Sequence, residues 1–231
     1  MKAVILAGGL GTRLKPFTNI IPKPLIPINR EESILEIQIK SLVDTGFDEI
    51  YIATNYKSEM IESYLGNGSK FGIKLYYSKE VKRLGTCGPL SLLKDKLNEP
   101  FLLMNGDILT ELNFKDMYEK SIINDAKITV GIKDIITPFD FGNVILKDNK
   151  VINIEEKPNL NFKILSGIYM MKPEIFSLIP DNTYFGIDDL LHKFLENGEE
   201  IASYQIEAYW LDIGRVDSLD EARERFSNND L

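Results

Sequence analysis

Cysteine and histidine are nearly absent from this chain of 231 residues, which contains one of each, Cys87 and His192. One cysteine excludes an internal disulfide and makes a cytosolic enzyme the default expectation. One histidine excludes a metal centre with several histidine ligands and leaves no obvious Ser-His-Asp triad. We interpret His192 as a structural residue of an amphipathic helix.

Long apolar runs are also missing. No segment is long enough to span a bilayer, and the apolar stretch at the N-terminus is too short for a signal peptide. The net charge of −8 and the pI of about 4.9 argue against nucleic acid and anionic membranes as main partners. A hydrophobic content of 44% is ordinary for a globular protein, so we expect a cytoplasmic globular enzyme.

The first 30 residues contain no acidic side chain, although the whole chain has 35 Asp and Glu. The same stretch holds five basic residues: Lys2, Arg13, Lys15, Lys23 and Arg30. A nucleic-acid surface would need excess positive charge over a whole face, whereas these cations gather around one glycine-rich loop. This pattern favours a compact polyanion such as a nucleoside triphosphate.

That loop, Ala7-Gly8-Gly9-Leu10-Gly11-Thr12-Arg13, directly follows the apolar run of residues 2–6. A buried strand that ends in clustered glycines can bring bare backbone N–H groups close to phosphate oxygens. The loop is neither a Walker motif nor a dinucleotide fingerprint, because the glycines those motifs require are missing. A tight structural turn with a chance arginine is the alternative.

The first half of the chain alternates strands and helices. After the extended, proline-rich segment around residues 16–27, we expect a helix over 33–43, a strand over 49–53, a helix ending near 65, a strand over 73–77, a second glycine loop at 84–90 that opens a helix, and an apolar strand over 100–107. Such alternation predicts an α/β, Rossmann-like, open and mostly parallel sheet with helices on both faces. Loop 8–13, loop 84–89 and Asp107 should then share the rim where such sheets bind ligands.

The second half is less regular. We expect a helix over 113–124, a strand over 127–132, a β-hairpin formed by 141–146 and 151–154, a strand over 164–171, short helices near 172–179 and 186–196, a strand over 201–206, and a closing helix over 217–226. Residues 1–231 contain no repeat or linker and are predicted to form a single domain, with a nucleotide-binding half to about residue 111 and a sugar-binding half from about 112.

In combination, these motifs resemble those of sugar-1-phosphate nucleotidyltransferases. The resemblance rests on residues 7–14, Pro22-Lys23-Pro24-Leu25, Leu84-Gly85-Thr86, Asn105-Gly106-Asp107, Glu155-Glu156-Lys157-Pro158, Gly167-Ile168-Tyr169 and Trp210-Leu211-Asp212-Ile213-Gly214. It is greatest to guanylyltransferases that act on mannose, glucosamine or heptose 1-phosphate. It implies the nucleotide-diphospho-sugar transferase fold, and we expect no C-terminal β-helix.

The resemblance implies roles for residues of the nucleotide side. The backbone of Leu6, Ala7, Gly8, Gly9, Gly11 and Thr12 would hold the nucleotide, with Arg13 on the β- and γ-phosphates; Gly85, Thr86 and Gly88 would line the base pocket. Lys23 would reach the α-phosphate or the sugar phosphate. Asp107 and Asp212 would ligate Mg²⁺, a cation that commonly takes one or two carboxylates. Arg13, Lys23, Asp107 and Asp212 are therefore the catalytic candidates. The alternative is a purely structural role for each aspartate, as a helix cap for Asp107 and as a turn residue for Asp212.

The resemblance also implies a sugar side, formed by Gly142, Glu156, Lys157 and Gly167. Without the resemblance, Glu156 and Lys157 would be interpreted as part of a solvated turn. Asn55 and Asp188 are weaker candidates, and Asp188 is equally suited to the first turn of a helix. Aromatic residues of the second half shape either the sugar pocket or the core: Phe139, Phe141, Tyr184 and Phe185.

Several alternatives stay open at this point. GTP is favoured, but dTTP, UTP and CTP are not excluded, and Cys87 stands near the presumed base pocket where family members often carry alanine. A non-catalytic nucleotide-sugar sensor is the rival from another class. The sugar and the oligomeric state are also open, a homo-oligomer being one possibility. Retention of Arg13, Lys23, Asp107 and Asp212 together favours an enzyme.

Overall fold

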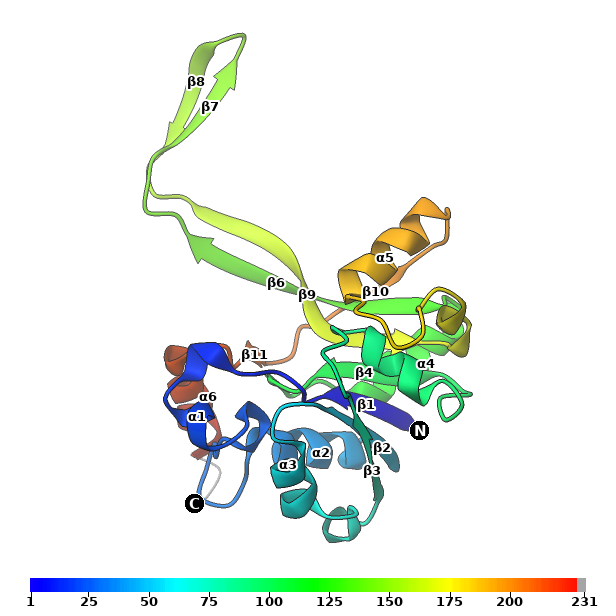
Figure 1. Cartoon of the computed structure of the whole chain (residues 1–231). Helices are drawn as coiled ribbons and strands as arrows, with labels where there is room; N and C mark the ends of the chain where they lie inside the picture. The colour runs from blue at the N-terminus through cyan, green and yellow to red at the C-terminus, as the bar shows by residue number, and fades with distance from the viewer. Residues whose placement is uncertain (228–231) are drawn as a thin grey trace.

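A seven-stranded sheet runs through the middle of the molecule in a computed structural model that describes residues 1–227 (Figure 1). Its strand order is β10-β6-β9-β4-β1-β2-β3. Six strands are parallel, and β9 alone runs antiparallel to its neighbours β4 and β6. The strands are β1 (Lys2–Leu6), β2 (Glu49–Thr54), β3 (Lys74–Lys79), β4 (Phe101–Asn105), β6 (Ile128–Pro138), β9 (Asn159–Met171) and β10 (Ala202–Gln205). The predicted open, mostly parallel α/β sheet is confirmed.

The central strand β1 is covered on both faces. Val4 pairs with Tyr51 of β2 and Leu103 of β4, and residues 3–5 are fully buried. Successive side chains point to opposite faces, so Ala3 and Ile5 join one apolar cluster while Val4 joins another. This two-sided burial explains why these strands are continuous apolar runs.

Helices lie on both faces, as predicted. The cluster with Ile5 is closed by α2 (Ile34–Asp44), α3 (Ser58–Leu65) and α4 (Phe114–Ile123). The cluster with Val4 is closed by α5 (Ile187–Glu196) and by short 3₁₀ segments. The remaining helices are α1 (Phe17–Ile20) and α6 (Val216–Ser227). None of the helices within residues 1–227 is both long and apolar enough to cross a bilayer.

Helix α2 begins at a capping box. Ser33 Oγ accepts from the backbone N–H of Glu36, and the Glu36 carboxylate accepts from the backbone N–H of Ser33. Two otherwise unpaired backbone donors are thereby satisfied. By contrast, two predicted helices are 3₁₀ segments, Gly88–Leu93 and Pro173–Ser177, both of which begin with a proline in the first two positions.

Two antiparallel strand pairs supplement the main sheet. Strand β5 (Ile108–Thr110) follows β4 and pairs with β11 (Trp210–Asp212), which brings the C-terminal part of the chain to the sheet's rim. Strands β7 (Asn143–Lys147) and β8 (Lys150–Glu155) form the predicted hairpin.

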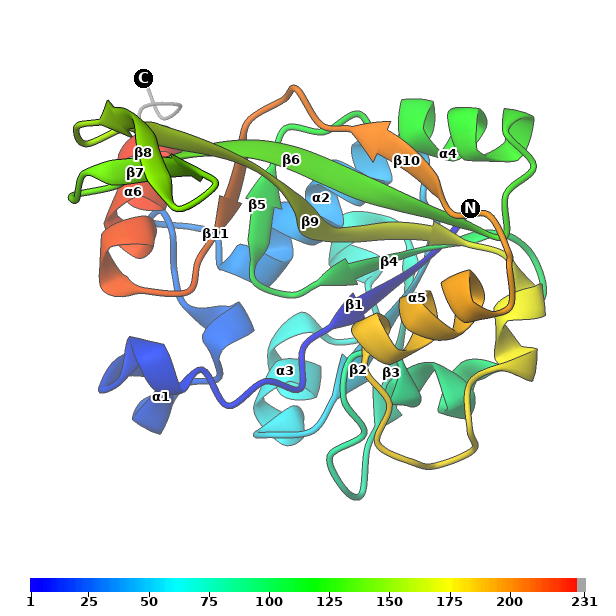
Figure 2. The same ribbon diagram turned by 90° about the horizontal axis from the view of Figure 1, so that it is seen from above.

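Strands β6 and β9 extend well beyond the residues that the sequence predicted for them. They leave the sheet as a two-stranded ribbon that carries the β7–β8 hairpin at its end, and Figure 1 shows this ribbon standing away from the body. Figure 2 views the same ribbon from above, so that the hairpin overlies α6 in projection. We call residues 134–165 the arm.

Candidate active site

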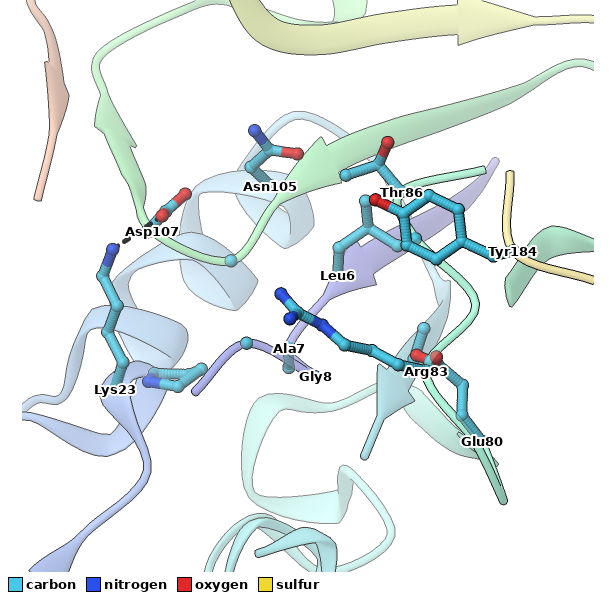
Figure 3. Close-up of a pocket in the computed structure, with 15 residues that line it drawn as sticks. Leu6, Ala7, Gly8, Lys23, Glu80, Arg83, Thr86, Asn105, Asp107 and Tyr184 are labelled. Carbon is cyan, nitrogen blue, oxygen red and sulfur yellow. Dashed lines mark hydrogen bonds and ion pairs between the residues drawn. The ribbon is translucent and has the colours of Figure 1, made fainter. Parts of the chain in front are cut away.

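A cleft of about 240 Å³ opens at the carboxyl ends of β1 and β4 (Figure 3). This is the rim at which open α/β sheets bind ligands. The sequence-predicted residues that line it are Leu6, Ala7, Gly8, Gly9, Lys23, Gly85, Thr86 and Asp107. Three separate predicted segments, residues 6–9, residues 85–86 and Asp107, therefore meet in one cleft.

Gly106 allows the two strand ends to approach each other. Its backbone N–H donates to the Leu6 carbonyl oxygen over 2.9 Å, and a Cβ at residue 106 would lie 2.5 Å from that oxygen. Any larger residue would push the β4 end away from β1. Asp107 follows directly and is thus held beside the glycine loop.

The glycine loop turns sharply at Gly11, which has a φ of +61°. A Cβ there would lie 2.7 Å from Thr18 Cγ2, and Thr18 Oγ1 donates to the Gly11 carbonyl. Gly9 is different, because a Cβ there would meet open space. Gly11 therefore has a structural reason to be glycine, whereas Gly9 leaves its backbone open to a ligand.

Lys23 and Asp107 form the ion pair at one end of the cleft. Lys23 Nζ donates to Asp107 Oδ2 over 2.6 Å, and Lys23 is buried while Asp107 keeps 29% of its side chain exposed. Pro22 and Pro24 flank the lysine and fix the backbone of its 3₁₀ turn. A lysine held in this way loses little additional conformational entropy when it binds an anion.

Asp212 lies beside Asp107 through the pairing of β11 with β5. The backbone N–H of Ile213 donates to the Asp107 carbonyl over 2.9 Å. Burial raises the pKa of Asp212, the neighbouring Asp107 raises that pKa further, and Lys23 and Arg13 oppose the shift. Within residues 1–227, Asp212 Oδ1 is buried without a hydrogen-bond partner. The two aspartates, which are far apart in the sequence, therefore lie close together in the structure. One buried oxygen of the pair, Asp212 Oδ1, has no hydrogen-bond partner among the described residues.

Arg13 lies near Asp212 and does not line the cleft. Its guanidinium packs against Gly214, where a Cβ would lie 2.9 Å from Arg13 Nη1. Arg13, Asp212 and Gly214 line a second depression next to the cleft. Thr12 begins the same short 3₁₀ turn as Arg13 and does not line the cleft.

The other end of the cleft holds residues that the sequence analysis missed. Glu80 and Arg83 line it together with Thr86 and Tyr184 (Figure 3). The Leu84 backbone N–H donates to Glu80 Oε2 over 2.8 Å. Burial raises the pKa of Glu80, while the Leu84 hydrogen bond and Arg83 lower it. One signal in the sequence could have identified Glu80. It directly follows strand β3, and β3 ends at the same rim of the sheet as the cleft.

The second glycine loop is locked to the chain before α5. The N–H groups of Cys87 and Gly88 both donate to the Phe185 carbonyl, and a Cβ at Gly88 would lie 2.5 Å from the Thr183 carbonyl oxygen. Gly88 therefore packs against this segment and does not line the cleft. Cys87 is buried, and burial raises the pKa of its thiol, which makes it unreactive.

The sugar-side candidates are divided between two places. Gly167, with a φ of +75°, adjoins the cleft, because a Cβ there would lie 2.6 Å from Asn105 Nδ2. Gly142 and Glu156 are neighbours on the arm, where a Cβ at Gly142 would lie 3.3 Å from Glu156 Oε2 and where Lys157 is also exposed. The structure thus brings Gly167 to the cleft and leaves Gly142, Glu156 and Lys157 within residues 134–165, the arm, whose backbone Figure 1 shows.

The weaker candidates have mostly structural surroundings. Asn55 lies under the glycine loop and donates to the Glu80 carbonyl, whereas Asp188 sits in the first turn of α5. Phe185 belongs to the core, and Phe139 packs edge-on against Phe141 in the arm. His192 is exposed on α5.

Comparison with known proteins gives a consistent result. The family model described as nucleotidyl transferase matches residues 2–229. The chain is 34% identical over 223 residues to the mannose-1-phosphate guanylyltransferase catalytic subunit beta of Dictyostelium discoideum, covering 93% of this chain and 61% of that protein. It is 33% identical over 225 residues to the mannose-1-phosphate guanyltransferase of Saccharomyces cerevisiae, covering 93% and 62%. The chain thus spans about three fifths of the length of these relatives.

Solved structures resemble this chain over nearly its full length. A putative glucose-1-phosphate thymidylyltransferase from Bacillus anthracis, crystallised with a sucrose, has a TM-score of 0.80 and 27% identity over 97% of this chain and 94% of its own. HddC from Yersinia pseudotuberculosis complexed with GMP-PN has a TM-score of 0.78 and 28% identity over 98% and 99%.

The half-buried aspartate pair should reduce the stability of the protein. Because burial and Asp107 raise the pKa of Asp212, its ionised form is disfavoured in the folded state at neutral pH. We expect Asp212→Asn to increase the free energy of unfolding, measured by urea denaturation at pH 7 with a chelator. Asp95→Asn, on an exposed site, is the matched control and should change nothing. A less stable Asp212→Asn protein would contradict this electrostatic description.

Proposed function

The chain belongs to the nucleotidyl transferase family, and on that premise we propose that it joins a nucleoside triphosphate, GTP, to a sugar 1-phosphate and releases pyrophosphate. A sugar-phosphate oxygen bonds to the α-phosphorus while the bond from that phosphorus to the leaving pyrophosphate oxygen breaks. Residues 1–111 hold the nucleotide, and residues 112–231 supply the sugar side. The relatives named for mannose 1-phosphate support a mannose-type substrate; glucosamine and heptose types remain alternatives.

The observation that carries this proposal is the convergence of Lys23, Asp107 and Asp212 at the rim of the sheet. The attacking oxygen is already anionic, so the reaction needs no general base and hence no histidine. The difficulty is to hold two anions together and to stabilise charge on the leaving group. Lys23 is suited to the first task because it is buried, fixed by prolines and aimed into the cleft.

The aspartate pair fits a divalent cation such as Mg²⁺. Within the described chain no group of three or more possible ligands converges, and two carboxylates are a common protein share for Mg²⁺. The buried, unpaired Asp212 Oδ1 is the atom that such an ion would satisfy. When bound, the ion would neutralise charge on the phosphates. Asp107 and Asp212 would hold it, which would free Lys23 for a phosphate oxygen.

Glu80 supports guanine as the base. It stands at the opposite end of the cleft from the Lys23–Asp107 pair, as expected if a nucleotide lies along the cleft with its phosphates near Lys23 (Figure 3). An ionised carboxylate only accepts hydrogen bonds, and guanine offers two adjacent donors, N1–H and the 2-amino group. Uracil and thymine offer one donor between two acceptors. The GMP-PN complex of HddC supports the same base.

The main rival keeps the reaction and changes the base to dTTP, UTP or CTP. It has support from the Bacillus anthracis neighbour, which is named for thymidylyl transfer. The other rival is a nucleotide-sugar sensor without activity. Incubation with each triphosphate and a panel of sugar 1-phosphates, followed by assay of pyrophosphate, separates the three. Pyrophosphate release only with GTP is expected, and no release with any pair would contradict an enzymatic function.

Asp107→Asn should abolish most of the turnover. The substitution removes one carboxylate from the pair, and loss of one such electrostatic contact typically lowers kcat about 100-fold or more. The assay measures pyrophosphate against Mg²⁺ concentration, with Asp95→Asn as the control of the same chemistry outside the cleft. Unchanged kcat and Mg²⁺ dependence in Asp107→Asn would remove this residue from the site.

Glu80→Gln should weaken the preference for GTP. A glutamine oxygen can still accept from the Leu84 N–H, so the loop is kept, but the other end of the amide is then an NH₂ donor that cannot accept from guanine. We expect the ratio of kcat/KM for GTP over UTP to fall about 10- to 100-fold. The preference for GTP over inosine triphosphate, which lacks the 2-amino group, should fall as well. Glu59→Gln, at an exposed ion pair with Lys79, is the control. Unchanged ratios would exclude Glu80 as the base-reading residue.

A further inference from the structure

The arm carries an unusual amount of exposed apolar surface. Eleven of the 24 large apolar side chains that are exposed in the described chain belong to it, with exposed fractions between 37% and 71%. They are Ile136, Phe139, Phe141, Val144, Ile145, Leu146, Val151, Ile152, Ile154, Phe162 and Leu165. Elsewhere the exposed apolar residues are mostly scattered singly or in pairs, which is normal for a folded protein.

One face of the β7–β8 hairpin is apolar and the other is mostly polar. Val144 pairs with Ile154, and Leu146 pairs with Val151, on the same face. The opposite face carries the pairs Asn143–Glu155, Ile145–Asn153 and Lys147–Lys150. An isolated two-stranded hairpin is at best marginally stable in water and needs a layer against its apolar face. Among residues 1–227 of one monomer no element covers this face, because these side chains are exposed.

We propose that the apolar face of the arm packs against the same face of a second copy of this chain, forming a two-fold symmetric dimer. A fully exposed aliphatic or phenyl side chain presents roughly 100 Å² of apolar surface. The exposed fractions then correspond to about 600 Å² over both faces of each arm, of which Val144, Leu146, Val151 and Ile154 on the apolar hairpin face supply about 230 Å². A standard interface buries about 800 Å² per partner, a little over half of it apolar. The dimer contact is therefore centred on the hairpin face and extends along the arm beyond it.

Charge distinguishes a second copy from other partners. The chain as a whole has a net charge of −8, but the arm has four lysines against five acidic residues. Two arms can approach each other without strong repulsion, whereas two acidic bodies repel. The arm has no excess of positive charge for an anionic membrane or an acidic partner. A symmetric contact also closes on itself, so assembly stops at the dimer.

Substitutions on the apolar face separate assembly from folding, because the affected side chains have few contacts within the monomer. Val144→Glu with Ile154→Lys places an opposite-charge pair across the two strands, which preserves the hairpin and buries charge in the dimer. The matched control is Asn143→Glu with Glu155→Lys, which places the same charge pair on the polar face of the same strands.

Light scattering after size exclusion and sedimentation velocity, over a dilution series of the full chain, measure the assembly. We expect a dimer for the wild type and for the control variant, and a monomer that still unfolds cooperatively for Val144→Glu/Ile154→Lys, with a melting temperature that no longer depends on protein concentration. Three results would overturn the proposal: a wild type that is monomeric at every concentration, a wild type that forms assemblies larger than a dimer, or an apolar-face variant that dimerises as well as the control. Dissociation of the wild type on dilution tests the contact without any substitution.

Discussion

The repulsion between two carboxylates held side by side is the constraint on which the rest of this site depends. Asp107 and Asp212 come from opposite halves of the chain, and neither would be placed near the other without a compensating cation. Lys23 supplies that compensation in the free protein through its ion pair with Asp107. The unpaired oxygen of Asp212 shows that the compensation is incomplete, so the cleft is suited to bind further positive charge.

The fold produces this arrangement with few elements. Parallel register aligns the carboxyl ends of β1 and β4, and Gly106 lets their backbones touch just before Asp107. A three-residue antiparallel pairing of β5 with β11 then brings Asp212 alongside. Two prolines hold the turn from which Lys23 reaches inward. The charged part of the site is built from strand ends and a proline-flanked turn, whereas three of the four sugar-side candidates, Gly142, Glu156 and Lys157, lie on the projecting arm.

Much of the fold followed from the sequence because its signals are local. Continuous apolar runs marked the buried strands, and apolar residues at helical spacing within 33–43 marked α2. The meeting of Asp212 with Asp107 could not be derived from spacing, since it depends on a pairing between residues about a hundred positions apart. Glu80 was missed because a carboxylate after a strand is commonplace. The length of the arm was missed because its strands are not covered by other elements. Such strands need not show the alternation of apolar and polar residues that identifies a half-buried strand.

The central claim of this account is that a metal-bound nucleotide binds at Asp107 and Asp212. Electron paramagnetic resonance of Mn²⁺, titrated into the protein with a saturating non-hydrolysable GTP analogue, tests it most directly. The wild type should take up Mn²⁺ stoichiometrically, whereas the Asp107→Asn/Asp212→Asn double variant should show only the Mn²⁺ held by the free nucleotide. Equal uptake by both proteins would contradict the account.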